Sequence, residues 1–154
     1  MPTVRSWRFL LGLLSIDGGV YLPIAFGVGF LQWQPHLNLG IVLRVSLQAL
    51  VMPGLLEELL FRVLLIPHPT EPLRPFLRRS WIGLSWLLFV LYHLLPWTPA
   101  FFREPVFLLG AGLLGLGCTV TYLHSRSIWT PMILHWAIVT PWLLLFGGLE
   151  KFQR

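Results

Sequence analysis

The stretch from Leu39 to Ile66, LGIVLRVSLQALVMPGLLEELLFRVLLI, decides the fold of this chain. As a helix it is long enough to cross about 30 Å of hydrocarbon. Glu57, Glu58 and Arg62 interrupt its apolar sequence within about a turn and a half of helix. Ionisable groups in hydrocarbon are costly unless they face a protein-lined cavity and find partners. The stretch therefore predicts a transmembrane helix that carries a functional site.

The composition of the whole chain also indicates a membrane protein. Of its 154 residues, 56% are apolar and only 11% are charged, and the mean hydropathy is +0.75. A soluble domain carries about 25% charged residues. The eleven Lys and Arg residues are scattered between apolar segments, which is typical of topogenic charges and argues against a nucleic-acid partner. Cys118 has no second cysteine to pair with, so we interpret it as a packing residue.

We predict an all-α, polytopic membrane bundle with about five transmembrane or membrane-embedded helices, forming one domain over residues 1–154. The first span lies within residues 9–33, where Asp17, Gly18 and Gly19 interrupt it. The other predicted spans are 39–66, 81–97, 105–123 and 128–149. The small residues of the fourth span predict a close-packing face, for a helix within the chain or outside it, which leaves the oligomeric state open. They are Gly110, Ala111, Gly112, Gly115 and Gly117.

The basic residues favour a cytoplasmic N-terminus, because inner segments of membrane proteins are enriched in Lys and Arg. With that orientation the inner segments hold Arg5, Arg8, Arg74, Arg78, Arg79 and Arg126, and the outer ones hold Arg103, Lys151 and Arg154. We expect an integral protein of a bacterial inner membrane or an organellar equivalent.

Helical spacing separates the two glutamates of the second span. Glu58 and Arg62 are four residues apart and can pair on one face, whereas Glu57 points about 100° away from Glu58 and has no local partner. That difference separates a structural acid from a candidate general base. Pro53 and Gly54 predict a kink just before the site and close approach of another helix.

Two further spans each carry a histidine, His93 and His135. With about 1.5 Å rise per residue, Glu57 lies about 14 Å from the inner face, His93 about 18 Å and His135 about 10 Å. The three side chains are therefore predicted to share one layer, provided that their spans alternate in direction.

Three motifs in this order resemble a known family. Glu-Glu-x-x-x-Arg at 57–62, Phe-x-x-x-His at 89–93 and Ser-x-Trp-x-Pro-x-x-x-His at 127–135 are similar to those of the CAAX prenyl protease and bacteriocin-processing family. Its members, also called type II CAAX proteases or Abi proteins, are glutamic-type intramembrane proteases. The resemblance covers about residues 39–145.

The resemblance implies that Glu57 activates a water with the help of His93, that Glu58 and Arg62 orient the site, and that His135 stabilises the oxyanion. It also implies an asparagine four residues after His135, where this chain has Val139. A missing oxyanion donor costs about 100- to 1000-fold in rate. Thr140 is a candidate substitute, although a regular helix places it about 140° from His135, unless Pro141 distorts that turn. Phe89, Val139 and Thr140 are accordingly the candidate substrate-binding residues.

Other interpretations remain beside the protease. Glu57, His93 and His135 would also make a His2Glu zinc site, although the resemblance implies no cofactor and no metal. The polar cluster would alternatively hold helices together in a non-catalytic membrane scaffold, chaperone or immunity protein. A third alternative is a proton-relaying transporter. The lack of an internal repeat and the small number of spans argue against it. The expected partners are membrane lipid and a membrane-associated or lipidated peptide substrate.

Overall fold

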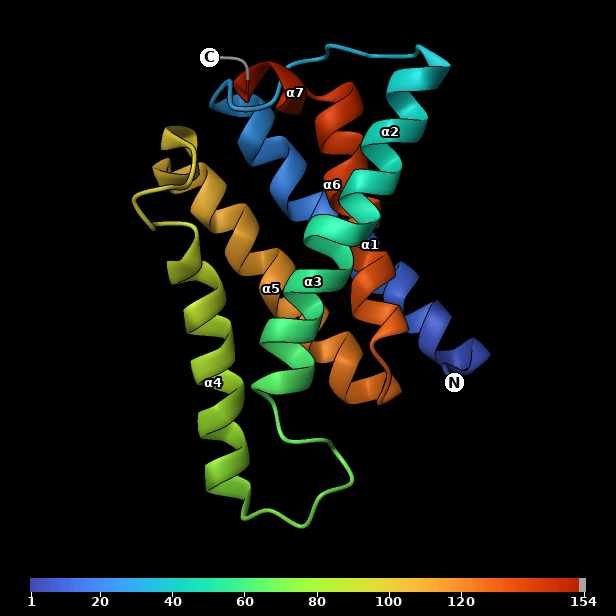
Figure 1. Cartoon of the computed structure of the whole chain (residues 1–154), viewed down its shortest axis with the longest axis vertical. Helices are drawn as coiled ribbons and strands as arrows, with labels where there is room; N and C mark the ends of the chain where they lie inside the picture. Colours follow the sequence, from blue (N-terminus) through green and yellow to red (C-terminus); the bar gives the residue numbers. More distant parts are fainter. Residues whose placement is uncertain (153–154) are drawn as a thin grey trace.

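The computed structural model describes residues 1–152, and they form an all-helical bundle without a β-sheet (Figure 1). Its helices, in chain order, are α1 (Val4–Gly27), α2 (Leu39–Ala49), η1 (Leu50–Leu55), α3 (Leu56–Glu58), η2 (Leu59–Leu64), α4 (Pro75–Tyr92), η3 (Ala100–Arg103), α5 (Pro105–Ser125), α6 (Trp129–Leu145) and α7 (Gly148–Lys151). Three segments are long and apolar enough to cross a membrane: α1, the run from α2 to η2, and α5. With α4 and the shorter apolar α6, they confirm the predicted all-α membrane fold.

Helix α1 differs from the predicted first span. It begins at Val4, where the Thr3 side chain accepts a hydrogen bond from the Ser6 amide, and it continues through Asp17 and both following glycines without interruption. The helix tolerates Asp17 because this residue faces protein: a Cβ placed on Gly117 of α5 would lie 3.0 Å from Asp17 Oδ2. The expected break at Asp17 was therefore wrong.

Helix α4 also begins earlier than predicted, at Pro75 instead of Trp81. Proline suits the first turn of a helix, because its missing N–H has no partner there in any case. Arg78 in that first turn donates to the backbone carbonyls of Pro67, His68 and Glu71, which ties the preceding loop to the helix. The helix ends at Tyr92, so His93 lies just beyond its last residue.

The second span is broken where Pro53 and Gly54 predicted a kink. Met52 has non-helical dihedral angles, φ −136° and ψ 112°, and the chain resumes a helical path after it. Gly54 allows close packing at this point, since an added Cβ would lie 2.9 Å from the Ala49 carbonyl oxygen and 3.5 Å from that of Met132 in α6. The break brings α3, which carries Glu57 and Glu58, against the middle of the bundle (Figure 1).

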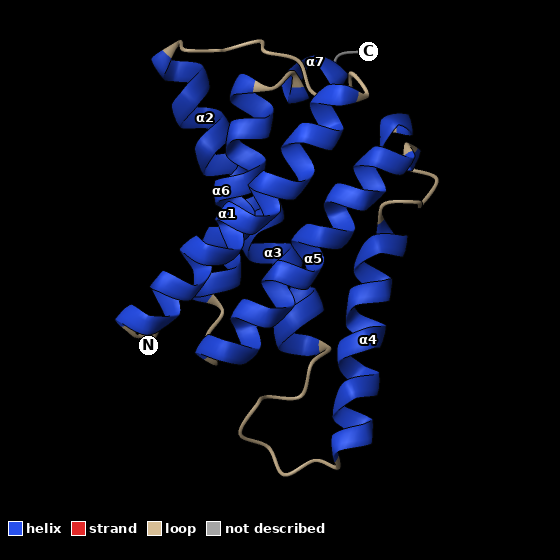
Figure 2. Cartoon of the chain, turned by 180° about the vertical axis from the view of Figure 1, so that it is seen from behind, coloured by secondary structure: helices blue, strands red, loops and turns tan. Residues whose placement is uncertain are grey.

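Helix α5 packs against α1, α4 and α6 (Figures 1 and 2). Its glycines confirm the predicted close packing, but they face more than one neighbouring helix instead of forming one face. Gly110 and Gly117 admit Tyr21 and Asp17 of α1, whereas Gly112 and Gly115 admit Trp86 and Phe89 of α4. The partner helices of these small residues lie within the chain.

Candidate active site

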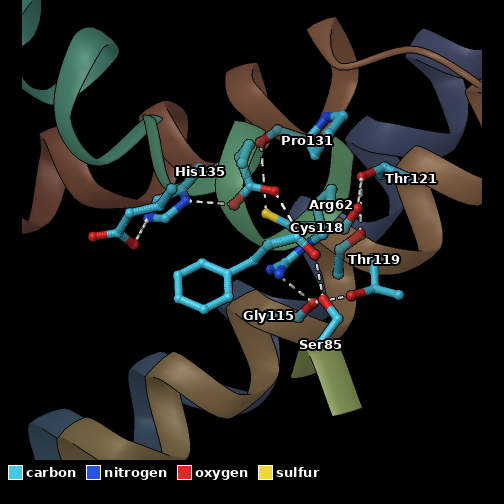
Figure 3. A network of polar contacts seen from close by, with 12 residues as sticks. Arg62, Ser85, Gly115, Cys118, Thr119, Thr121, Pro131 and His135 are labelled. Carbon is cyan, nitrogen blue, oxygen red and sulfur yellow. Dashed lines mark hydrogen bonds and ion pairs between the residues drawn. The ribbon is translucent and has the colours of Figure 1, made fainter. Parts of the chain in front are cut away.

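Glu58 and Arg62 form the buried centre of the site. Both side chains are fully buried, and Arg62 Nε lies 3.2 Å from Glu58 Oε2, in the pairing that their spacing predicted. Arg62 also donates to the Gly115 carbonyl of α5 at 3.3 Å (Figure 3). Its guanidinium lies 4.8 Å from the centre of the Phe89 ring. A cation over an aromatic face is stabilised by the ring quadrupole. These contacts tie the second span to α4 and α5.

His135 lies between the two glutamates. Its Nδ1 is 2.8 Å from Glu58 Oε1, and its Nε2 is 3.9 Å from Glu57 Oε2. A carboxylate accepts, so Nδ1 carries the proton of this hydrogen bond. Nε2 then faces Glu57, and it donates a hydrogen bond only when the ring is doubly protonated.

His93 is held by the end of its own helix. Its Nδ1 lies 2.9 Å from the Phe89 carbonyl oxygen, which can only accept, so Nδ1 carries the proton. In the neutral ring Nε2 is then an acceptor. The rings of Phe89, Phe102 and Phe107 lie 5.1, 5.3 and 5.4 Å from that of His93 and fix its orientation.

One largely apolar cavity of about 650 Å³ brings Glu57, His93 and His135 together. All three line its wall: Glu57 lies in α3, His93 directly follows α4, and His135 lies in α6. Glu58 and Arg62 do not line it and lie behind His135. The arrangement provides a space for substrate beside one carboxylate and two imidazoles, and a second carboxylate that holds one of the imidazoles.

Of the remaining predicted residues, two line this cavity and one does not. Phe89 is fully buried and lines it, and so does Val139. Thr140 does not line it, and its hydroxyl oxygen is buried without a hydrogen-bond partner among the described residues. Helix α6 continues through Pro141, so the regular rotation of the helix keeps Thr140 off the face of His135. The geometry therefore does not support Thr140 as the substitute donor.

The cluster of possible metal ligands differs from the predicted zinc alternative. Among the described residues, the group close enough to share an ion is Glu58, Cys118 and His135, whose ligand atoms lie within 4.8 Å of one another. Glu57 and His93 are not part of such a group there. Arg62 is already paired with Glu58, and Glu58 with His135, so these side chains satisfy one another as an ion-pair network.

Two residues of this region were not assigned to the site from sequence. Cys118, interpreted as a packing residue, borders Glu58 and His135 and also lies 3.5 Å from the Pro131 carbonyl (Figure 3). Asp17 lines the same cavity as Glu57. The sequence feature that could have identified Asp17 is its position in the middle of an apolar helix, where an ionisable side chain is a functional candidate by default.

Comparison with known protein families agrees with the motifs. The family model "Type II CAAX prenyl endopeptidase Rce1-like" matches residues 38–140, which include Glu57, Glu58, Arg62, His93 and His135 and exclude α1. The curated proteins and the solved structures gave no match. The match confirms the resemblance drawn from the motifs and implies an integral membrane protease. This chain belongs to the Rce1-like family of type II CAAX prenyl endopeptidases.

Proposed function

We propose that this protein hydrolyses a peptide bond next to a membrane-embedded or lipid-anchored segment, with Glu57 as the general base. The observation that carries this proposal is the shared cavity, on whose wall Glu57, His93 and His135 meet. A carboxylate and two imidazoles provide a base, a means of positioning water and a hydrogen-bond donor, which are the groups that peptide hydrolysis requires.

In the proposed reaction Glu57 accepts a proton from a water that His93 Nε2 helps to orient. The water oxygen attacks the scissile carbonyl carbon, and the carbonyl π electrons move to its oxygen. Doubly protonated His135 donates from Nε2 to this oxyanion. As the intermediate collapses, the C–N bond breaks and the proton held by Glu57 passes to the leaving nitrogen. The products are a carboxylic acid and an amine, so no other reactant is needed.

Glu58 and Arg62 are positioning residues in this proposal. Glu58 accepts from Nδ1 of His135 at 2.8 Å, which directs the other ring nitrogen toward the cavity. Arg62 neutralises Glu58 and is itself held by the Gly115 carbonyl. Neither side chain needs to touch the substrate, because neither lines the cavity. No metal takes part, since the acid, the base and the oxyanion donor are all side chains.

The apolar cavity suits a substrate with an apolar or lipidated segment, because such a segment would move from the lipid into another apolar environment. Phe89 and Val139 would contact it there. We place the N-terminus in the cytoplasm, of a bacterial cell or an organellar equivalent. In support, the start of α1, the start of α4 with the loop before it, and the turn after α5 lie toward one end of the bundle (Figure 1). These segments carry Arg5, Arg8, Arg74, Arg78, Arg79 and Arg126, six of the eleven Lys and Arg residues.

A second candidate function is favoured by Val139. This side chain lines the cavity but cannot donate to an oxyanion. A non-catalytic scaffold, chaperone or immunity protein of the same family would keep the buried network of Glu58, Arg62 and His135 for packing alone.

Replacing Glu57 by Gln separates the two functions. We would reconstitute the full chain in proteoliposomes with a fluorogenic peptide that carries a prenylated cysteine, and with membrane-spanning peptides analysed by mass spectrometry. Loss of the base should lower the cleavage rate by about 100- to 10,000-fold, without changing the thermal unfolding midpoint. Glu71→Gln is the matched control, because Glu71 lies in the loop before α4 and does not line the cavity. Equal cleavage by wild type and Glu57→Gln, or no cleavage by wild type, would favour the scaffold.

A further inference from the structure

Asp17 is a second carboxylate on the wall of the candidate active-site cavity. It lies in the middle of α1, outside the residues that the family model matches. It lines the cavity together with Glu57, and its Oδ2 atom is buried without a hydrogen-bond partner among the described residues. The residue as a whole is half-buried, and a buried carboxylate oxygen without a partner is costly, more so within a membrane.

Two consecutive residues of α5 place Asp17 at the level of the site. Gly117 faces Asp17, whose Oδ2 would be 3.0 Å from an added Cβ. The next residue, Cys118, lies within 4.8 Å of both Glu58 and His135 through its sulfur atom. One residue rises about 1.5 Å along a helix, so Asp17 and the buried network lie in one layer of the bundle. Helix α1 packs beside α5 and α6 here (Figures 1 and 2).

The cavity has acidic groups but no fixed cation. Asp17 and Glu57 line it, whereas none of the described residues on its wall is Lys or Arg. Two nearby cations do not line the cavity and face other groups: Arg62 is paired with Glu58, and Lys151 lies over the ring of Phe30. The His135 imidazole on the wall faces Glu57 and Glu58, so an occupant that carries a positive charge would supply what Asp17 lacks. In an apolar cavity, a hydrogen bond between two charged groups is stronger than between neutral ones.

We propose that Asp17 is a specificity-determining residue that binds a positively charged side chain of the substrate peptide, Lys or Arg. The charged side chain pairs with the Asp17 carboxylate while an adjoining part of the same peptide lies against Glu57, His93 and His135. The role of the bound peptide as substrate rests on the proposed hydrolysis, but the binding of the cation does not. Asp17 takes no part in bond cleavage.

The test compares two membrane-embedded peptides that differ in one residue. One peptide has Lys at this position, and the other has norleucine, whose side chain has the same number of carbon atoms but no ammonium group. A series places this residue at successive positions. Dissociation constants are measured with the full chain in nanodiscs of phosphatidylcholine and phosphatidylglycerol, lipids that carry no primary amine. At one or more positions, wild type should bind the Lys peptide about 10- to 100-fold more tightly than its norleucine match. Asp17→Asn should abolish this preference, Asp17→Glu should retain part of it, and the control Glu71→Gln should retain all of it.

The proposal is overturned if wild type binds the Lys peptide no more tightly than the norleucine peptide at every position. It is also overturned if folded Asp17→Asn keeps the full preference for the Lys peptide. If Asp17→Asn does not fold, the wild-type ratio and the Asp17→Glu ratio decide. Cleavage of the same peptides is measured in parallel. Asp17-dependent binding without any cleavage supports the cation site and counts against the hydrolase. Cleavage without Asp17-dependent preference supports the hydrolase and counts against the cation site.

Discussion

Glu58 and His135 are 77 positions apart in the chain, yet they share a fully buried hydrogen bond of 2.8 Å between Oε1 and Nδ1. The other oxygen of the same carboxylate is 3.2 Å from Arg62 Nε. One side chain therefore joins the second span to α6 and holds both an imidazole and a guanidinium. Because both contacts run through Glu58, removing its charge leaves the Arg62 guanidinium buried without a counter-charge.

The first prediction concerns the stability of this network. Glu58→Gln should lower the free energy of unfolding by about 3–5 kcal/mol, because it leaves the Arg62 guanidinium buried without a counter-charge. Arg62→Met should have a similar cost. The double variant Glu58→Gln, Arg62→Met should be more stable than the sum of the two losses predicts, since neither charge remains. Thermal or denaturant unfolding in detergent measures all three, and strict additivity would contradict the prediction.

The second prediction concerns the missing oxyanion donor. Val139 lines the cavity four residues after His135, so Val139→Asn should place an amide on the wall and raise the cleavage rate by about 100- to 1000-fold. The matched control is Thr140→Asn, because Thr140 does not line the cavity and its amide would not reach the substrate. Single-turnover rates in proteoliposomes provide the comparison. A gain in the control but not in Val139→Asn would show that α6 presents a different face to the substrate.

The third prediction concerns the close approach of α6 to the kink. Gly54→Ala should destabilise the fold by about 1–3 kcal/mol, because the new methyl group would meet backbone carbonyls that cannot rotate away. Its Cβ would lie 2.9 Å from the Ala49 oxygen, whereas a Cβ at Gly83 of α4 meets nothing within 4 Å. Gly83→Ala should therefore be neutral or stabilising by up to about 1 kcal/mol, as expected for alanine in a helix. The unfolding midpoint of Gly54→Ala should be lower than that of Gly83→Ala. The opposite order would contradict the prediction.

The fourth prediction concerns metal independence. Prolonged dialysis against a strong chelator such as 1,10-phenanthroline should leave the cleavage rate unchanged, because the proposed base, water-positioning group and oxyanion donor are all side chains. Elemental analysis of the purified protein should accordingly give less than about one tenth of a zinc ion per chain. A protein with a zinc site would instead contain about one zinc ion per chain. Loss of activity on chelation, with recovery on adding Zn²⁺, would instead favour the His2Glu alternative.

The sequence by itself determined the features of this protein that depend on short distances along the chain. Apolar run lengths predicted the membrane helices, because hydrocarbon thickness sets how many helical residues are needed. Proline and glycine at 53 and 54 predicted the break at Met52, and the four-residue spacing predicted the pair of Glu58 and Arg62, since neighbours on a helix face are fixed by local geometry. The order of the motifs predicted the family, which the match over residues 38–140 confirmed.

The tertiary structure alone decided which side chains from different helices meet. It joined His135 to Glu58 as well as to Glu57, turned Thr140 away from the cavity and brought Asp17 onto its wall. Helical periodicity gives the angle between residues of one helix, but the rotation of each helix about its own axis is set by its neighbours. In this bundle that rotation follows from close approaches at Gly54, Gly110, Gly115 and Gly117, where a missing side chain on one helix admits a large or polar group from another.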